Sequence, residues 1–119
     1  MRDAATIAKY YIAFWNETDP KRRAEVLADE WEENATYVDP VMHGSGRGEI
    51  ESLVAGVHAR FPDYRFRLTT QPNGFGEYVR FAWSLGPADG NAPIEGSDVV
   101  VMKGDRISQV IGFLDKVPQ

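Results

Sequence analysis

Two aspartates stand in apolar stretches of this sequence, and a pair of acids of that kind can move protons. Asp39 closes the stretch 35–39 just ahead of Pro40, and Asp98 comes directly before the apolar run 99–102. Burial pushes a carboxyl group toward its neutral form, so two acids in different surroundings can hold different protonation states at one pH. One acid could then act as a base while the other donates a hydrogen bond.

The stretch 35–39 alternates as a strand does, which places Tyr37 and Asp39 on one face. Pro40 has no amide hydrogen for a strand ladder, and it biases Asp39 toward an extended conformation. We therefore expect the Asp39 carboxylate to be held on the apolar side of the strand, in a pocket for a small hydrophobic ligand or substrate.

Each acid also has a purely structural interpretation. Asp39 could close an Asx-type turn with Pro40, and Asp98 could bond backbone groups where a strand begins. Tyr11, on the apolar face of the first predicted helix, could donate to a developing oxyanion, or it could be a core residue whose hydroxyl finds a local partner. Tyr10 could instead be the tyrosine that faces inward.

The remaining polar candidates are two histidines and an arginine. His43 lies in a predicted loop, and His58 flanks the apolar face of a predicted helix, where a supporting hydrogen bond is a more typical role than catalysis. The histidines lack the close spacing of metal ligands, and the glycine-rich segment 43–48 lacks the lysine of a phosphate-binding loop, so we expect no metal and no cofactor. Arg80 could be solvated, paired with Asp98, or an electrophile.

The elements that must position these side chains follow from periodicity. Apolar residues at helical spacing, with capping signals, predict helices over residues 3–16, 20–29 and 50–61. Alternating patterns predict strands over residues 35–39, 64–69, 78–85, 94–102 and 107–114.

The connections between these elements predict the fold. Segment 43–48 is predicted to be a flexible lead-in to the third helix, segment 71–74 a turn, and Trp31 a residue that covers the turn after the second helix. Short turns favour antiparallel neighbours. The order therefore predicts an α+β fold, a cone in which three N-terminal helices pack on one face of a curved antiparallel sheet.

Composition limits the classes of function. A chain of 119 residues with 43% hydrophobic residues is typical of one folded domain, which we place over residues 1–119. The net charge of -5 disfavours nucleic acid as a partner. Without a leader segment or a long apolar run, we expect a cytoplasmic protein with no membrane segment. Apolar residues on the second sheet face, either Val99 and Val101 or Phe81 and Trp83, predict a homodimer through that face.

Around the two acids and Tyr11 we expect a wall of aromatic and apolar side chains with one histidine. This wall consists of Trp15, Trp31, Tyr37, Met42, His58, Phe61, Phe81, Trp83, Val100 and Phe113. Buried aromatic side chains also form the core of many small domains. The same residues could instead fill the cone, which would leave a dimerisation domain without a ligand.

Five motifs give the sequence a resemblance to a known family. They are Tyr11 with Phe14-Trp15-Asn16 ahead of Asp19, the stretch 34–41, Gly46-Arg47 ahead of Ile50, the stretch 96–100 and the stretch 112–115. In this order they resemble the SnoaL-like branch of the nuclear transport factor 2-like (NTF2-like) superfamily, and the resemblance covers nearly the whole chain.

Within that superfamily, Tyr11, Asp39 and Asp98 resemble the tyrosine and two aspartates of ketosteroid isomerases. The resemblance implies that Asp39 abstracts and returns a proton next to a carbonyl, while Tyr11 and protonated Asp98 hold the enolate oxygen. SnoaL-like cyclases similarly use an acid in this pocket for aldol closure of a polyketide. An isomerase or a cyclase is thus the expected function. A non-catalytic ligand-binding or dimerisation module is the alternative, and an epoxide hydrolase scheme with Arg80 fits less naturally.

Overall fold

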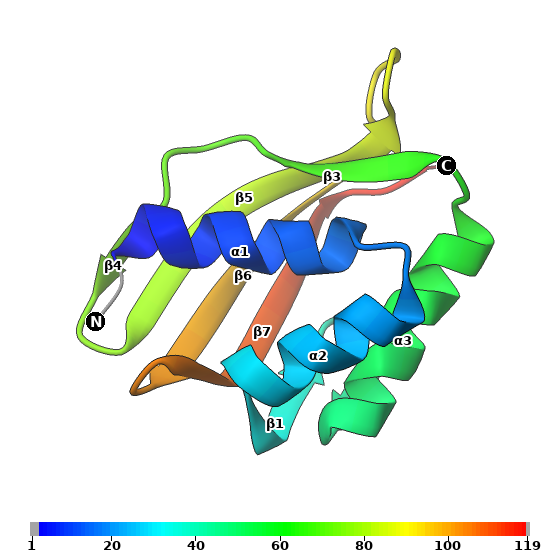
Figure 1. Cartoon of the computed structure of the whole chain (residues 1–119). Coiled ribbons are helices and arrows are strands. Elements are labelled where there is room, and N and C mark those ends of the chain that lie inside the picture. The colour runs from blue at the N-terminus through cyan, green and yellow to red at the C-terminus, as the bar shows by residue number, and fades with distance from the viewer. Residues whose placement is uncertain (1–2, 119) are drawn as a thin grey trace.

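The computed structural model describes residues 3–118 and shows helices lying across one face of a curved sheet (Figure 1). Within those residues the helices are α1 (Ala4–Asn16), α2 (Pro20–Glu30) and α3 (Arg47–Arg60). The strands are β1 (Trp31–Val38), β2 (His43–Ser45), β3 (Tyr64–Leu68), β4 (Asn73–Phe75), β5 (Tyr78–Pro87), β6 (Ile94–Lys103) and β7 (Arg106–Lys116). The predicted α+β class and the cover of three helices are confirmed.

Capping acids set where the first two helices begin. Asp3 Oδ1 accepts a hydrogen bond of 2.8 Å from the amide of Thr6 at the start of α1. Asp19 Oδ1 accepts one of 3.0 Å from the amide of Lys21 at the start of α2. These caps satisfy amide groups that have no partner inside the helix. All three predicted helices are present, and α3 begins at Arg47 rather than at residue 50.

The sheet is ordered β2-β1-β7-β6-β5-β3, and β4 pairs with β5. β1 and β7 run parallel, with Tyr37 opposite Val110, whereas the other pairs are antiparallel. The prediction of an antiparallel sheet is wrong at this one pair. Turn lengths indicate only how strands adjacent in sequence pair, and β1 and β7 lie far apart along the chain.

Three local predictions are also wrong. β1 begins at Trp31 rather than at residue 35, because the chain passes from α2 directly into the strand. Segment 43–48 is not a free lead-in, since β2 pairs with β1 and its Gly44 lies opposite Tyr37. The predicted turn at 71–74 overlaps β4, which pairs with the start of β5. β2 and β4 are three residues long, too short for an alternating pattern to appear.

The core lies between the helices and the inner face of the sheet. Tyr11, Phe14 and Trp31 are buried there. The ring centroid of Trp31 lies 6.2 Å from that of Tyr11 and 5.3 Å from that of Phe14. A partly buried ion pair joins α2 and α3, in which Arg23 of α2 donates to Glu51 of α3 with Nε to Oε1 at 2.6 Å. These contacts fix α1 relative to β1 and α2 relative to α3.

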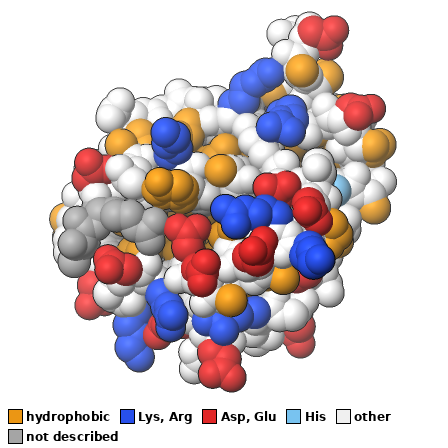
Figure 2. All heavy atoms as spheres, in the orientation of Figure 1, with side chains coloured by type: hydrophobic (Ala, Val, Ile, Leu, Met, Phe, Trp, Pro, Cys, Tyr) orange, Lys and Arg blue, Asp and Glu red, His pale blue; other side chains and the backbone are white. Residues whose placement is uncertain are grey.

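The face that carries α1 and α2 shows acidic and basic side chains interspersed (Figure 2). This face therefore presents no field of a single sign. None of the helices within residues 3–118 combines the length and the apolar character needed to cross a membrane.

Candidate functional site

Asp98 is the centre of a buried group of polar side chains. It lies in the middle of β6 with 3% of its surface exposed. Tyr11, from α1, donates its hydroxyl to Asp98 Oδ2 at 2.7 Å. Trp83, from β5, donates its indole N–H to Asp98 Oδ1 at 3.0 Å. The structural interpretation of Asp98 as a backbone partner at a strand start is wrong, because both oxygens bond side chains.

Two glycines make room for this arrangement. Trp83 lies opposite Gly96 on the neighbouring strand, and Asp98 lies opposite Gly112 on the next. A Cβ at Gly96 would overlap the Trp83 indole, and one at Gly112 would lie 2.9 Å from Asp98 Oδ1. Because Gly96 and Gly112 have no side chains, the Trp83 indole and the Asp98 carboxylate occupy the space above them. Both glycines begin stretches that resemble family motifs, 96–100 and 112–115. The sequence alone did not indicate that they make room for Trp83 and Asp98.

Asp39 lies just beyond the end of β1 and is half-buried. Its Oδ1 accepts hydrogen bonds from the amides of Val41 (2.8 Å) and Met42 (2.9 Å), which forms the Asx-type turn that was the structural interpretation of this residue. Its Oδ2 accepts a bond of 2.7 Å from the hydroxyl of Tyr37. One carboxylate oxygen thus holds the turn, and the other faces a phenol inside the cone.

The two acids meet across Gly112. The position of a Cβ at Gly112 would be 3.2 Å from Asp39 Cβ and 3.5 Å from the Tyr37 hydroxyl, in addition to its contact with Asp98. Tyr37 therefore lies beside both acids. The structure brings Tyr11, Asp39 and Asp98 to one region, with Tyr37 and Trp83 as hydrogen-bond donors to the acids.

The surroundings raise the pKa of several of these groups. Burial raises the pKa of Asp98 to about 6, helped by the nearby charge of Asp39 and opposed by the hydrogen bonds from Tyr11 and Trp83. Burial, followed by the charge of Asp98, raises the pKa of Tyr11 well above its usual value. Burial, followed by the charges of Asp98 and Asp39, also raises the pKa of Tyr37. Both phenols therefore keep their protons at neutral pH and remain donors.

The predicted wall divides into three groups. Trp15, Trp31, Tyr37, Phe81, Trp83 and Val100 are buried on the inner side, and Met42, His58 and Phe61 are half-buried. Phe113 as a wall residue is wrong, because it is 54% exposed on the opposite face of the sheet, where the alternation of β7 turns Gly112 inward.

The polar residues left open by the sequence are also placed. Tyr11 is the inward tyrosine with 2% exposure, whereas Tyr10 is 49% exposed. His43 and Arg80 are exposed, and Arg80 lies opposite Val99 on the outer face, so it does not pair with Asp98. Within residues 3–118 no three His, Asp or Glu side chains form a group that could hold a metal ion.

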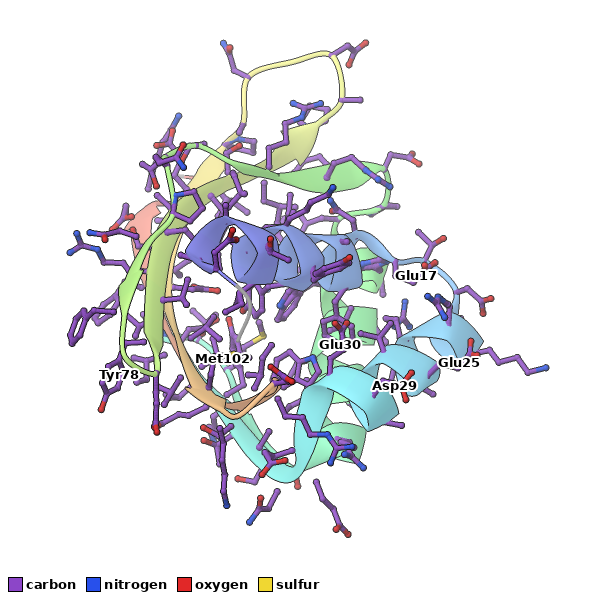
Figure 3. The ribbon with its side chains drawn as sticks, turned by 60° about the vertical axis from the view of Figure 1, so that its left-hand side comes forward. Glu17, Glu25, Asp29, Glu30, Tyr78 and Met102 are labelled. Atoms are coloured by element: carbon purple, nitrogen blue, oxygen red, sulfur yellow. The ribbon has the colours of Figure 1, made fainter. Side chains whose placement is uncertain are left out.

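Side chains close the site around Asp98. A hollow of about 10 Å³, room for about one water molecule, lies on another side of Tyr11 and is lined in part by Glu30, Trp31 and Met102. Figure 3 shows Met102 and Glu30 below α1 at this hollow. Asp98 itself does not line this hollow and is reached by a ligand only if neighbouring side chains move.

Comparisons with known proteins agree on the fold. The sequence model of the SnoaL-like domain matches residues 8–110. A crystal structure from Agrobacterium tumefaciens, provisionally named an isomerase of the SnoaL-like family, is 42% identical, covers 94% of this chain and 97% of its own, and has a TM-score of 0.90. Among curated proteins, none matches this chain.

More distant structures share the fold at lower identity. A protein of Sinorhizobium meliloti, provisionally named a polyketide cyclase, is 13% identical over 90% of this chain and 93% of its own, with a TM-score of 0.72. A protein of Catenulispora acidiphila with a ketosteroid isomerase-like fold is 18% identical over 92% of this chain and 85% of its own, with a TM-score of 0.74.

Proposed function

This chain belongs to the SnoaL-like domain family, within the NTF2-like superfamily, and on that basis we propose that it is an enzyme that transfers protons next to a carbonyl group of a small molecule. The observation that carries the proposal is the buried hydrogen bond between Tyr11 and Asp98, with Asp39 on the other side of Gly112. The provisional name of the Agrobacterium tumefaciens relative, an isomerase, supports the same class of reaction.

In this mechanism Asp39 is the base. Its Oδ2, the oxygen not engaged by the amides of the turn, takes a proton from the carbon beside the carbonyl, and the electron pair of that C–H bond moves to the carbonyl oxygen. Asp39 then returns the same proton to carbon, either at the original position or further along a conjugated system. The second outcome is an isomerisation.

Tyr11 and Asp98 stabilise the enolate oxygen. A protonated Asp98 can donate to the Tyr11 oxygen, which frees the Tyr11 hydrogen to point at the ligand. Trp83 always donates, so it holds Asp98 Oδ1 as an acceptor in either protonation state. A polyketide cyclase would use the same parts, with the enolate carbon attacking a second carbonyl of the same molecule.

The test is exchange of α-hydrogens with deuterium. We expect the protein to accelerate exchange of 1-indanone in D2O, followed by loss of the α-proton signals in NMR spectra. Asp39→Asn should slow the catalysed exchange by about 10²- to 10⁴-fold, the usual contribution of a general base. The control is Asp89→Asn, which removes an exposed acid from the turn after β5. Equal rates for wild type and Asp39→Asn would contradict the proposal.

A binding module without turnover is the second candidate, and it is favoured by the structural role of Asp39, whose Oδ1 is held by two backbone amides of the turn. Asp39 would then serve the turn through Oδ1 and the ligand through Oδ2. In that case Asp39→Asn would keep its affinity for 1-indanone, and neither protein would exchange the α-hydrogens of the ketone.

We also propose a second copy of this chain as a partner, bound through the outer face of the sheet. Val38, Ile111 and Val99 lie side by side on β1, β7 and β6 and point away from the helices. Phe113 and Tyr78 extend this apolar surface, and the helices of residues 3–118 all lie on the other face of the sheet. Burial of such a face between two copies would remove the apolar surface from water.

A further inference from the structure

The indole of Trp15 contains a buried N–H that donates no hydrogen bond of good geometry within residues 3–118. Trp15 is 3% exposed, and its Nε1 is the buried side-chain nitrogen or oxygen that lacks a hydrogen-bond partner within residues 3–118. Leaving a buried N–H unpaired costs about 1–3 kcal/mol. Such groups are rare in native proteins, and each one calls for a partner from outside the chain or a functional reason.

This donor belongs to the same group of side chains as the two acids. The ring of Trp15 packs 5.5 Å from the ring of Tyr37 and 6.4 Å from that of Tyr11, measured between centroids. The Trp15 N–H also lies near enough to the Tyr11 hydroxyl to work against the other causes that raise the pKa of that phenol, although the geometry of this contact falls short of a hydrogen bond. The unpaired N–H therefore lies on the side of the Tyr11 oxygen.

Trp15 is held firmly in place. His58 Nε2 lies 2.6 Å from the carbonyl oxygen of Trp15. The next residue, Asn16, exchanges two hydrogen bonds with the backbone of Phe66, at 2.9 and 2.8 Å. The C-terminal end of α1 is thus fixed to α3 and to β3, so the indole is positioned before any ligand arrives.

The hydrogen bonds within the site use every donor except one. Trp83 donates to Asp98 and Tyr37 donates to Asp39, whereas the Trp15 N–H makes no hydrogen bond within residues 3–118. We propose that Trp15 is a ligand-binding residue whose indole N–H donates to an acceptor oxygen of the ligand, the same oxygen that Tyr11 faces. This inference rests on the proposed function for the location of the site and for the carbonyl compound as its ligand, and it adds a second donor to the carbonyl oxygen.

The test uses a matched pair of small molecules and the indole N–H signals of the protein. 1-Indanone carries the carbonyl oxygen, and indane has the same ring system without it. In ¹⁵N-labelled protein each of the three tryptophans contributes one indole signal, and that of Trp15 is assigned by its loss in Trp15→Phe. If that variant does not fold, Trp31→Phe and Trp83→Phe assign the signal by elimination.

We expect 1-indanone to move the Trp15 indole proton downfield and indane to leave it nearly unchanged. Trp15→Phe should weaken binding of 1-indanone by about 3- to 10-fold, the effect of one net hydrogen bond. Phe14→Leu is the packing control, since it removes part of a buried ring from the same helix without removing a donor. No shift up to the solubility limit of 1-indanone, or an equal shift with indane, would overturn the inference.

The two proposals fail separately. A downfield shift of the Trp15 signal without exchange of α-hydrogens would support the ligand contact and contradict the proposed catalytic function. Exchange of α-hydrogens without that shift would support the enzyme and remove Trp15 as a contact residue.

Discussion

Asp98 and Gly112 are cross-strand partners on β6 and β7, and the carboxylate of Asp98 uses the space that a side chain at Gly112 would take. Asp39 borders the same space from the end of β1. One glycine thus decides whether two acids from different parts of the sequence can approach each other.

Gly112→Ala should therefore disturb the site directly. The added methyl group would lie 2.9 Å from Asp98 Oδ1 and 3.2 Å from Asp39 Cβ, closer than ordinary contact allows. We expect unfolding in urea to show a loss of about 1–3 kcal/mol, as is usual for an overpacked interior. The control is Gly56→Ala in α3, where a Cβ meets nothing within 4 Å and better helix propensity should stabilise the protein. Equal stability changes in both variants would contradict this prediction.

The raised pKa of Asp98 predicts how stability depends on pH. In the unfolded chain this group titrates near its ordinary value of 3.8, whereas in the folded protein it titrates at about 6. The folded state therefore holds the proton more tightly, and the contribution of Asp98 to stability is fully present below about pH 4 and is lost as the pH rises through about 6. The shift corresponds to about 3 kcal/mol.

The measurement is the free energy of unfolding of the wild type minus that of Asp98→Asn, at pH 4 and at pH 7. Ionisable groups that both proteins share cancel in this difference. Since asparagine does not titrate, the pH dependence that is left belongs to Asp98. We expect this difference to be smaller at pH 7 than at pH 4, because the ionised Asp98 destabilises the folded wild type at the higher pH. The same difference at both values would show that Asp98 is not perturbed by burial.

Trp83 should control the pH at which the site works. If protonated Asp98 supports Tyr11, catalysed exchange of 1-indanone should decline as the pH rises above about 6. The hydrogen bond from Trp83 lowers the pKa of Asp98, so Trp83→Phe should move this decline to higher pH. Asp98→Asn should abolish the decline. If the pH profile of Trp83→Phe matches that of the wild type, Trp83 does not influence the protonation of Asp98 and this prediction is wrong.

The outer face of the sheet predicts an association that depends on its apolar residues. Ile111→Asp would place a charge between Val38 and Val99 and should convert a dimer to a monomer in light scattering after gel filtration. Val41→Asp is the control, because Val41 is apolar and 75% exposed but lies in the turn after β1. A wild type that is monomeric at micromolar concentration would contradict the proposal.

Much of the fold follows from local signals in the sequence. Asp3, Asp19 and Pro62 mark helix boundaries, and the alternation of β3, β5, β6 and β7 assigns most inward residues. The parallel pairing of β1 with β7 could not be predicted in the same way, since it depends on contacts between segments that no turn connects.

The site was predictable at the level of residue types but not of contacts. Asp39, Asp98 and Tyr11 could be named from their patterns and from the family resemblance, and the structure brings them to one region. The unpaired indole of Trp15 is different, because an aromatic residue on a helix face gives no sign of where its N–H ends up.

The parallel contact between β1 and β7 has a consequence for synthesis of the chain. β7 leaves the ribosome after β1 and β6, and until it inserts between them, both strands keep an open edge with unpaired backbone groups. The contacts that complete the sheet therefore span most of the sequence, which favours slow folding. A nascent chain stalled before Arg106 should be more prone to edge-to-edge aggregation than a chain that includes β7.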